Sequence, residues 1–194
     1  MVTPALLRGS DLDGGLAFLG GPYNNHLALR AVLEDARARG AARIFCLGDL
    51  GGFGPSPEKI YPLLREHEVF TIAGNYDRSL AERLSDCGCG YTHPDDNRYA
   101  QLSYDYTDRR TSDAERTWLG ALPEQAIFER RGRRYRLCHG SPRRVNEFLW
   151  ESASSDAFLL RSARVAGAAS LLCTHTGIPW QRLVARVTRV GNVG

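Results

Sequence analysis

The sequence has no apolar run long enough to cross a lipid bilayer, although hydrophobic residues make up 43% of its 194 residues. Its N-terminus also lacks the basic and then apolar order of a secretory signal. The five cysteines are an odd number, and a chain of this size can fold around its own core without disulfides. We therefore predict a cytoplasmic protein with reduced thiols and no membrane partner.

An excess of charge of one sign is absent as well. The formal net charge of +3 is too small to argue for a nucleic-acid partner. Arginines gather only around Gly132, where residues 130–136 resemble the turn of a hairpin. We interpret this cluster as a solvated turn, with a polyanion-binding patch as the alternative. The motif Cys87-Gly88-Cys89 is a reduced loop in our interpretation, and the alternative is a soft-metal or redox site.

What the sequence does contain is an alternation of short apolar runs with helical patterns, which predicts an α/β fold in one domain over residues 1–194. We predict strands at 16–19, 42–47, 69–73, 135–138, 169–173 and 183–190, and helices at 27–39, from 56, from 111 or 112, and at 155–166. Residues 1–14 are expected to form a flexible tail. Residues 86–110 are predicted to be an insertion or cap, with an alternating pattern at 99–104 that suggests a strand.

Four of these strands end at residues that can bind a metal: Asp49, Asn75, His139 and His175. Ligands of α/β proteins bind at the carboxyl ends of the strands, so these side chains are expected to converge. A carboxylate, an amide oxygen and two imidazoles suit Mn, Fe or Zn. Each residue alone also has a plainer explanation, as a turn former or a hydrogen-bonded strand end.

The segments around these residues resemble motifs of the calcineurin-like metallophosphoesterases, and the resemblance extends from about residue 16 to the C-terminus. Residues 48–55 resemble G-D-x-x-x-x-G-P, 74–77 resemble G-N-H-D, 139–142 resemble H-G-S/D-P and 174–179 resemble G-H-T-H-x-P. The likeness is to the small bacterial phosphodiesterase branch. It implies a four-layer sandwich of two mixed β-sheets flanked by helices.

Members of this family bind two metal ions about 3 to 4 Å apart. By resemblance, the ligands of one ion fall on Asp49, Asn75, His139 and His175, and that set is complete. The ligand positions of the other ion fall on Gly21, Tyr23 and Gly177. We therefore expect one divalent ion per chain, of Mn, Fe or Zn.

The resemblance also assigns catalytic and substrate-binding positions. The family's histidine acid is Tyr76 here, and its partner is Asp77. A phenol with a pKa of about 10 is a poor acid at neutral pH, so we expect Tyr76 to face the cleft and bind phosphate by a hydrogen bond. The predicted substrate-binding residues are Asn25, Tyr23, Arg143 and Arg144.

These observations predict a metal-dependent phosphoesterase that hydrolyses phosphodiesters or phosphomonoesters with a reduced metal site. The alternative is a catalytically impaired protein of the same fold that acts as a binding or regulatory module. We expect a small phosphorylated substrate or phosphate as its partner, and the sequence leaves a homo-oligomer open. Residues 191–194 resemble the family's closing N-P-G motif, so a truncated C-terminus is also left open.

Overall fold

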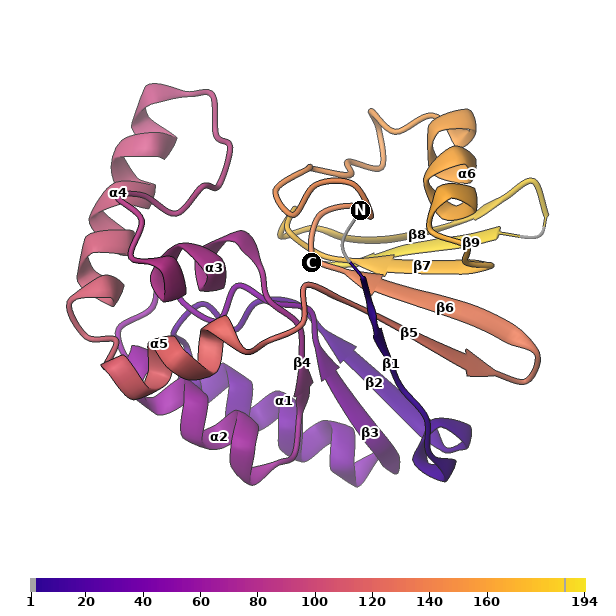
Figure 1. Ribbon diagram of the computed structural model, residues 1–194, viewed down its shortest axis with the longest axis horizontal. Coiled ribbons are helices and arrows are strands. Elements are labelled where there is room, and N and C mark those ends of the chain that lie inside the picture. The colour runs from indigo at the N-terminus through magenta and orange to yellow at the C-terminus, as the bar shows by residue number, and fades with distance from the viewer. Residues whose placement is uncertain (1–2, 187) are drawn as a thin grey trace.

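The computed structural model describes residues 3–186 and 188–194, which form two sheets enclosed by helices (Figure 1). The six-stranded sheet has the order β1-β5-β6-β7-β9-β8, and the three-stranded sheet has the order β2-β3-β4. The strands are β1 (Ala5–Leu6), β2 (Gly15–Leu19), β3 (Ala41–Cys46), β4 (Phe70–Thr71), β5 (Gln125–Arg130), β6 (Arg133–Cys138), β7 (Ser170–Cys173), β8 (Pro179–Val184) and β9 (Thr188–Val193). The α-helices are α1 (His26–Ala38), α2 (Ile60–Glu66), α3 (Asn75–Glu82), α4 (Pro94–Asp108), α5 (Asp113–Gly120) and α6 (Asp156–Val165).

The two sheets pack face to face through an aromatic core. The rings of Phe45 in β3 and Phe128 in β5 stack with centroids 5.6 Å apart, and Phe18 in β2 stacks on Phe45 at 4.9 Å. A second hydrophobic cluster joins the three-stranded sheet to α1 to α5, and a third joins the six-stranded sheet to α6. The predicted four-layer α/β sandwich is therefore confirmed. Both sheets were expected to be mixed, and the six-stranded sheet is, but the strands of the three-stranded sheet are all parallel.

Local sequence signals explain several element boundaries. The α5 helix begins after Ser112, whose hydroxyl accepts from the amide of Glu115 while the Glu115 carboxylate accepts from the amide of Ser112. Ser155 caps α6 in the same position. The hairpin turn predicted around Gly132 is confirmed: β5 and β6 are antiparallel and the chain turns at Arg131 and Gly132, both with positive φ.

The strand predicted at 99–104 is wrong, because this segment lies inside α4. Pro94 occupies the first turn of that helix, and Ala100, Tyr104 and Thr107 form its buried face at helical spacing. In Figure 1, α4 projects on the side of the molecule away from the six-stranded sheet. Its role as an insertion or cap stays a prediction.

Both ends of the chain differ from the prediction. Residues 1–14 were expected to be a flexible tail, but β1 pairs in parallel with β5 and Leu12 is buried between the sheets. Apolar side chains that cover the sandwich core give this segment a fixed place. The single strand expected at 183–190 is a hairpin, because the chain reverses at Ala185 and Arg186, both with positive φ. Residues 1, 2 and 187 of these two predictions lie outside the described residues.

The cysteines also differ from the prediction. Cys87 and Cys89 form a disulfide, whereas Cys46, Cys138 and Cys173 are free and buried. The turn at Gly88, which has φ 61°, brings the two Cα atoms to 5.3 Å. The expectation of reduced thiols is therefore wrong for this pair. Among the described residues, none of the helices combines the length and the apolar composition needed to span a membrane.

Candidate metal centre

The four predicted metal ligands lie just past the ends of four strands that belong to both sheets. Asp49 and Asn75 follow β3 and β4 of the three-stranded sheet, whereas His139 and His175 follow β6 and β7 of the six-stranded sheet. Their exposed fractions are 4% for Asp49, 4% for Asn75, 1% for His139 and 7% for His175. Polar side chains from both halves of the sandwich are thus buried at one place.

Three of these side chains converge closely. The Asp49 Oδ2 atom lies 3.1 Å from His139 Nε2 and 3.9 Å from His175 Nδ1. The two imidazole nitrogens lie 3.1 Å apart. One potential ligand atom from each of the three residues fits within a mutual separation of 4.8 Å, which is the spacing of donors around one small cation.

The fourth predicted ligand, Asn75, is fixed by its amide nitrogen. Asn75 Nδ2 donates to the Cys87 carbonyl at 2.9 Å and to Cys89 Sγ at 3.5 Å. Its Oδ1 atom is buried without a hydrogen-bond partner, and so is His175 Nε2. Buried polar atoms are nearly always satisfied, so an orphan oxygen on Asn75, whose neighbour Tyr76 donates its amide to Asp49 Oδ1 at 3.1 Å, fits a bound cation. Whether Asn75 Oδ1 reaches the same ion stays a prediction.

The imidazole of His139 is held in the orientation that a metal ligand needs. Its Nδ1 atom lies 2.7 Å from the carbonyl oxygen of Leu47, so that Nδ1 donates there and Nε2 is left to face Asp49 and His175. A backbone acceptor of this kind sets the tautomer of a metal-binding histidine. The donor set and its orientation therefore fit a divalent first-row metal.

Charges in the cluster shift one another's pKa values. Burial alone would raise the pKa of Asp49, but the neighbouring His139 and His175 outweigh burial and lower it. Burial alone would lower the pKa of His139, yet the Asp49 carboxylate raises it. The Asp49 carboxylate is therefore ionised and strongly bound to positive charge, which a metal ion can supply in place of a proton.

The backbone around the ligands is unusually tight. Asp49 has φ 57° and His175 has φ 76°, a region that residues other than glycine rarely adopt. A Cβ atom on Gly48 would lie 2.8 Å from the Cα atom of Gly74, so the loops after β3 and β4 touch through these two glycines. Strained backbone of this kind is typical of functional sites.

Asp77, predicted as a catalytic residue, instead holds these loops together. Its Oδ2 accepts from the amides of Asp49 at 2.9 Å and Gly74 at 2.8 Å, and its Oδ1 accepts from Leu50 at 3.0 Å. It is fully buried, and burial together with the charge of Asp49 raises its pKa to about 6. All of the hydrogen bonds that the structure gives its carboxylate go to backbone amides, which assigns it a structural role.

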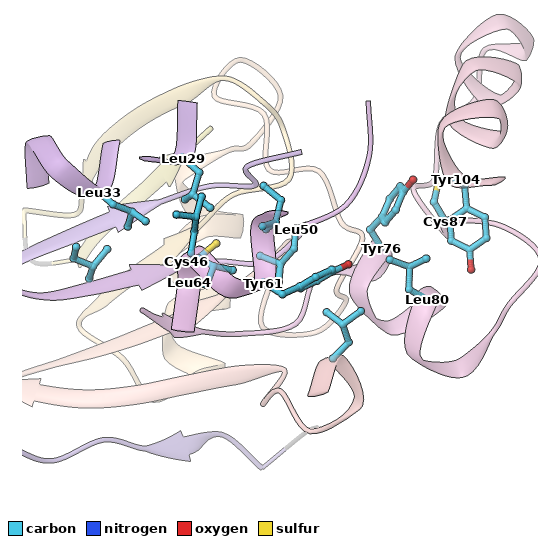
Figure 2. Close-up of a cluster of buried hydrophobic side chains, with 14 of the residues drawn as sticks. Leu29, Leu33, Cys46, Leu50, Tyr61, Leu64, Tyr76, Leu80, Cys87 and Tyr104 are labelled. Carbon is cyan, nitrogen blue, oxygen red and sulfur yellow. The ribbon is translucent and has the colours of Figure 1, made fainter. Parts of the chain in front are cut away.

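Tyr76 was expected to face the cleft, and here the structure corrects the prediction. Its side chain is 2% exposed and lies in the hydrophobic cluster beside Leu50, Leu80 and Tyr104 (Figure 2). The phenol donates to Thr107 Oγ1 at 3.3 Å, and burial raises its pKa to about 12. Aromatic packing against Tyr104 of α4 thus holds the ring in the core.

Two predicted substrate-binding residues, Tyr23 and Asn25, lie in the loop between β2 and α1. Asn25 is exposed, and its side-chain oxygen caps α1 by accepting from the amide of Ala28 at 3.1 Å. Tyr23 lines a cavity of about 680 Å³ with Gly20, Gly21 and Phe53. A Cβ atom on Gly21 would lie 3.0 Å from the Tyr23 ring and 2.6 Å from the Asp49 carbonyl oxygen. Burial and the charge of Asp49 raise the pKa of the Tyr23 phenol.

Arg143 and Arg144 line a different cavity from that of Tyr23. Both are exposed and line a cavity of about 510 Å³ that reaches His139 and also contains Arg78 and Ser141. The Arg143 guanidinium forms an ion pair with Glu147, so its charge is already partly neutralised and it is less available to bind phosphate. Arg144 is therefore the better placed of the two predicted phosphate-binding arginines.

Two features of the site were missed by sequence reasoning. The Phe148 ring stacks on His175 with centroids 4.2 Å apart, and Trp150 stacks on Phe148 at 5.1 Å. The other is the disulfide loop, whose Cys87 carbonyl accepts a hydrogen bond from the Asn75 amide. The Cys-Gly-Cys spacing was a visible signal for the loop, whereas nothing in the sequence placed Phe148 beside a histidine 27 positions later.

Comparison with known proteins gives the family. Residues 23–190 match the calcineurin-like phosphoesterase superfamily domain. An uncharacterised protein of Methanocaldococcus jannaschii is 27% identical over 145 residues, which are 74% of this chain and 57% of that protein. The chain thus spans little more than half the length of this curated relative.

Two solved structures share the fold at 21% identity. A hypothetical protein from Pyrococcus horikoshii has a TM-score of 0.74 over 91% of this chain and 75% of its own. A metallophosphoesterase from Sphaerobacter thermophilus has a TM-score of 0.69 over 92% and 75%. Because the domain match covers most of the chain, the chain belongs to the calcineurin-like phosphoesterase superfamily.

Proposed function

We propose that this chain is a metal-dependent phosphoesterase that works with one divalent ion bound by Asp49, Asn75, His139 and His175. The observation that carries the proposal is the buried cluster of Asp49, His139 and His175, whose ligand atoms fit within 4.8 Å. The orphan oxygen of Asn75 beside Cys87 supports the fourth position. The family supplies the reaction class, hydrolysis of a phosphoester.

The side chains divide the chemistry as follows. A divalent ion bound here would act as a Lewis acid on a phosphoryl oxygen and favour deprotonation of water. The Asp49 carboxylate and the fixed His139 tautomer hold the donor geometry, while Asp77 anchors both loops. Arg144, at the cavity that reaches His139, is placed to bind phosphate oxygens.

The expectation of one ion rests on the residues at the second metal position. The second metal position of the family needs side chains where this chain has Gly21, Tyr23 and Gly177. The Tyr23 ring and the Asp49 carbonyl oxygen crowd the space into which a Gly21 side chain would project. One ion activates a nucleophile and neutralises phosphate charge less than two do, so turnover is expected to be slow.

A binding or regulatory module is the second candidate, and the position of Tyr76 favours it. With that phenol in the core, the position that holds the family's acid offers no proton donor to a leaving group. The two candidates share the metal site and the phosphate-binding arginine, and they differ in turnover.

The test combines metal stoichiometry with hydrolysis. We expect Mn²⁺ titration to give one tightly bound ion per chain, and His175→Asn to lose it. Purified protein with Mn²⁺ should hydrolyse bis(4-nitrophenyl) phosphate slowly and lose this activity in His175→Asn. Metal and phosphate binding without turnover in the unmodified protein would support the module instead. Two tightly bound ions, or none, would contradict the proposed site.

A further inference from the structure

The disulfide loop, residues 86–91, contacts the side chain of the proposed ligand Asn75. The Cys87 carbonyl and Cys89 Sγ both accept from Asn75 Nδ2, at 2.9 and 3.5 Å. An amide group has one donor end and one acceptor end, so these contacts decide which end faces the metal centre. With Nδ2 turned to the loop, Oδ1 is left as the buried, unpartnered ligand atom.

The same loop also contacts the support of His175. The Gly88 carbonyl accepts from Asn146 Nδ2 at 2.9 Å, and the Tyr91 ring packs on Phe148 with centroids 5.9 Å apart. Phe148 in turn stacks on His175. Residues 86–91 therefore join the surroundings of one ligand from each sheet.

The loop depends on its cross-link for this shape. Cys87 and Cys89 are 5% and 8% exposed, and between them the chain has only Gly88, whose amide donates to Asp86 Oδ1 at 2.7 Å. The disulfide closes a very short ring, which restricts the directions that the Cys87 carbonyl can take. With free thiols the segment gains backbone freedom, since glycine has the widest conformational range.

We propose that Cys87 and Cys89 form a redox-responsive positioning element for the metal ligand Asn75. In the disulfide state the loop holds the amide with Oδ1 toward the ion and metal affinity is high. In the dithiol state the Asn75 amide loses its fixed acceptors and metal affinity falls. This inference rests on the proposed metal site.

The redox step is an ordinary two-electron exchange. Reduction by a cellular dithiol breaks the Cys87–Cys89 bond, gives two protein thiols and leaves the reductant as a disulfide. With a trialkylphosphine and water, the same bond breaks to two thiols and the phosphine becomes its oxide. Both routes deliver two electrons and two protons to the cysteine pair, and exchange with a small-molecule disulfide, which is reduced to two thiols, re-forms the bond.

The experiment measures Mn²⁺ affinity in both redox states, by the loss of the free-ion signal in electron paramagnetic resonance. Manganese is the probe because a hard ion binds thiolates poorly, so released thiols do not act as new ligands. Thiol counts under denaturing conditions verify each state, with three free thiols expected in the oxidised chain. We expect the phosphine to weaken Mn²⁺ binding about tenfold or more, as removal of an outer-sphere partner does.

The double variant Cys87→Ser/Cys89→Ser provides the control. It should bind Mn²⁺ as weakly as the reduced chain and should not respond to phosphine. If the disulfide of the folded chain resists reduction, this variant still reports the affinity of a chain without the cross-link. Equal Mn²⁺ affinity in the oxidised chain, the reduced chain and the variant would overturn the inference while leaving the metal site intact. Failure of the disulfide to form under mild oxidants would overturn it too. Absence of Mn²⁺ binding in both redox states would instead remove the proposed function, and this inference with it.

Discussion

Gly74 is the residue through which the two ligand-bearing loops of the three-stranded sheet meet. A Cβ atom there would lie 2.6 Å from the Asp49 amide nitrogen and 2.9 Å from His139 Cε1, and would also overlap Asp49 Oδ1. The φ of Gly74 is −88°, which any residue adopts, so the glycine is needed for space rather than for conformation.

The substitution Gly74→Ala should therefore displace Asp49 and His139. We expect Mn²⁺ affinity to fall by at least about tenfold, because ligand positions must shift, and stability to fall by about 1–3 kcal/mol from overpacking. Isothermal titration and denaturant unfolding measure the two effects. Gly120→Ala in α5 is the matched control, since its Cβ atom would lie 3.6 Å from the Ala81 Cβ atom in α3, an ordinary contact, and it should leave metal affinity unchanged. Unchanged affinity in Gly74→Ala would contradict the tight packing described for the centre.

Asp77 and Tyr76 show how far residue-level prediction reached. The motif that contains them is in contact with Asp49, since Asp77 accepts from the amide of Asp49 and the amide of Tyr76 donates to Asp49 Oδ1. Their roles could not be predicted, because the side chain of Tyr76 turns toward partners on α4 that are distant in sequence. A segment whose helical character the sequence did not show supplies those partners.

At the scale of the elements, the buried hydroxyl of Thr107 in α4 forms hydrogen bonds with two neighbouring segments of the chain. Thr107 Oγ1 accepts from Asn24 Nδ2 at 2.8 Å and from the Tyr76 phenol at 3.3 Å, and it donates to the Ser103 carbonyl at 3.0 Å. The helix is thereby connected both to the loop before α1 and to α3. Thr107 is fully buried.

Replacing Thr107 with Val keeps the shape of the side chain and removes the hydroxyl. Asn24 Nδ2 would lose its acceptor, and the Tyr76 phenol would keep only Ser103 Oγ at 3.5 Å, so we expect a loss of about 1–3 kcal/mol in the free energy of unfolding. Thr117→Val in α5 is the control, because Thr117 is exposed, and it should change stability by less than about 0.5 kcal/mol. Urea unfolding measures the stability of both variants. If Thr107→Val is as stable as Thr117→Val, the Thr107 hydroxyl does not hold α4 in place.

Elements were predictable where the pattern was local. The strands before Asp49 and His139, the helix capped by Ser112 and the hairpin at Gly132 follow from periodicity, caps and turns. The failures concern tertiary contacts. Residues 99–104 alternate like a strand, but Pro94 and the core around Tyr104 favour a helix. The β1 strand exists only because β5 offers it an edge to pair with.

At the scale of the whole molecule, the centre joins the two sheets of the sandwich. Asp49 and Asn75 belong to the three-stranded sheet and its loops, whereas His139 and His175 belong to the six-stranded sheet. The aromatic core of Phe18, Phe45 and Phe128 packs the same sheets together. A cation bound by all four ligands would add a cross-link to that core, and it would bind the folded chain only.

Mn²⁺ should therefore stabilise the whole fold. An ion present at about 100 times its dissociation constant adds about 2.7 kcal/mol if it binds the native state alone. For a chain of this size, about 2–4 °C of Tm per kcal/mol gives an expected rise of about 5–11 °C. Asp49→Asn is the control, because it keeps an oxygen for the amide of Tyr76 and loses the charge that holds the ion. Calorimetry with and without Mn²⁺ measures both proteins. A rise of the same size in Asp49→Asn would place the ion elsewhere, and no rise in the unmodified chain would mean that the two sheets do not share a metal.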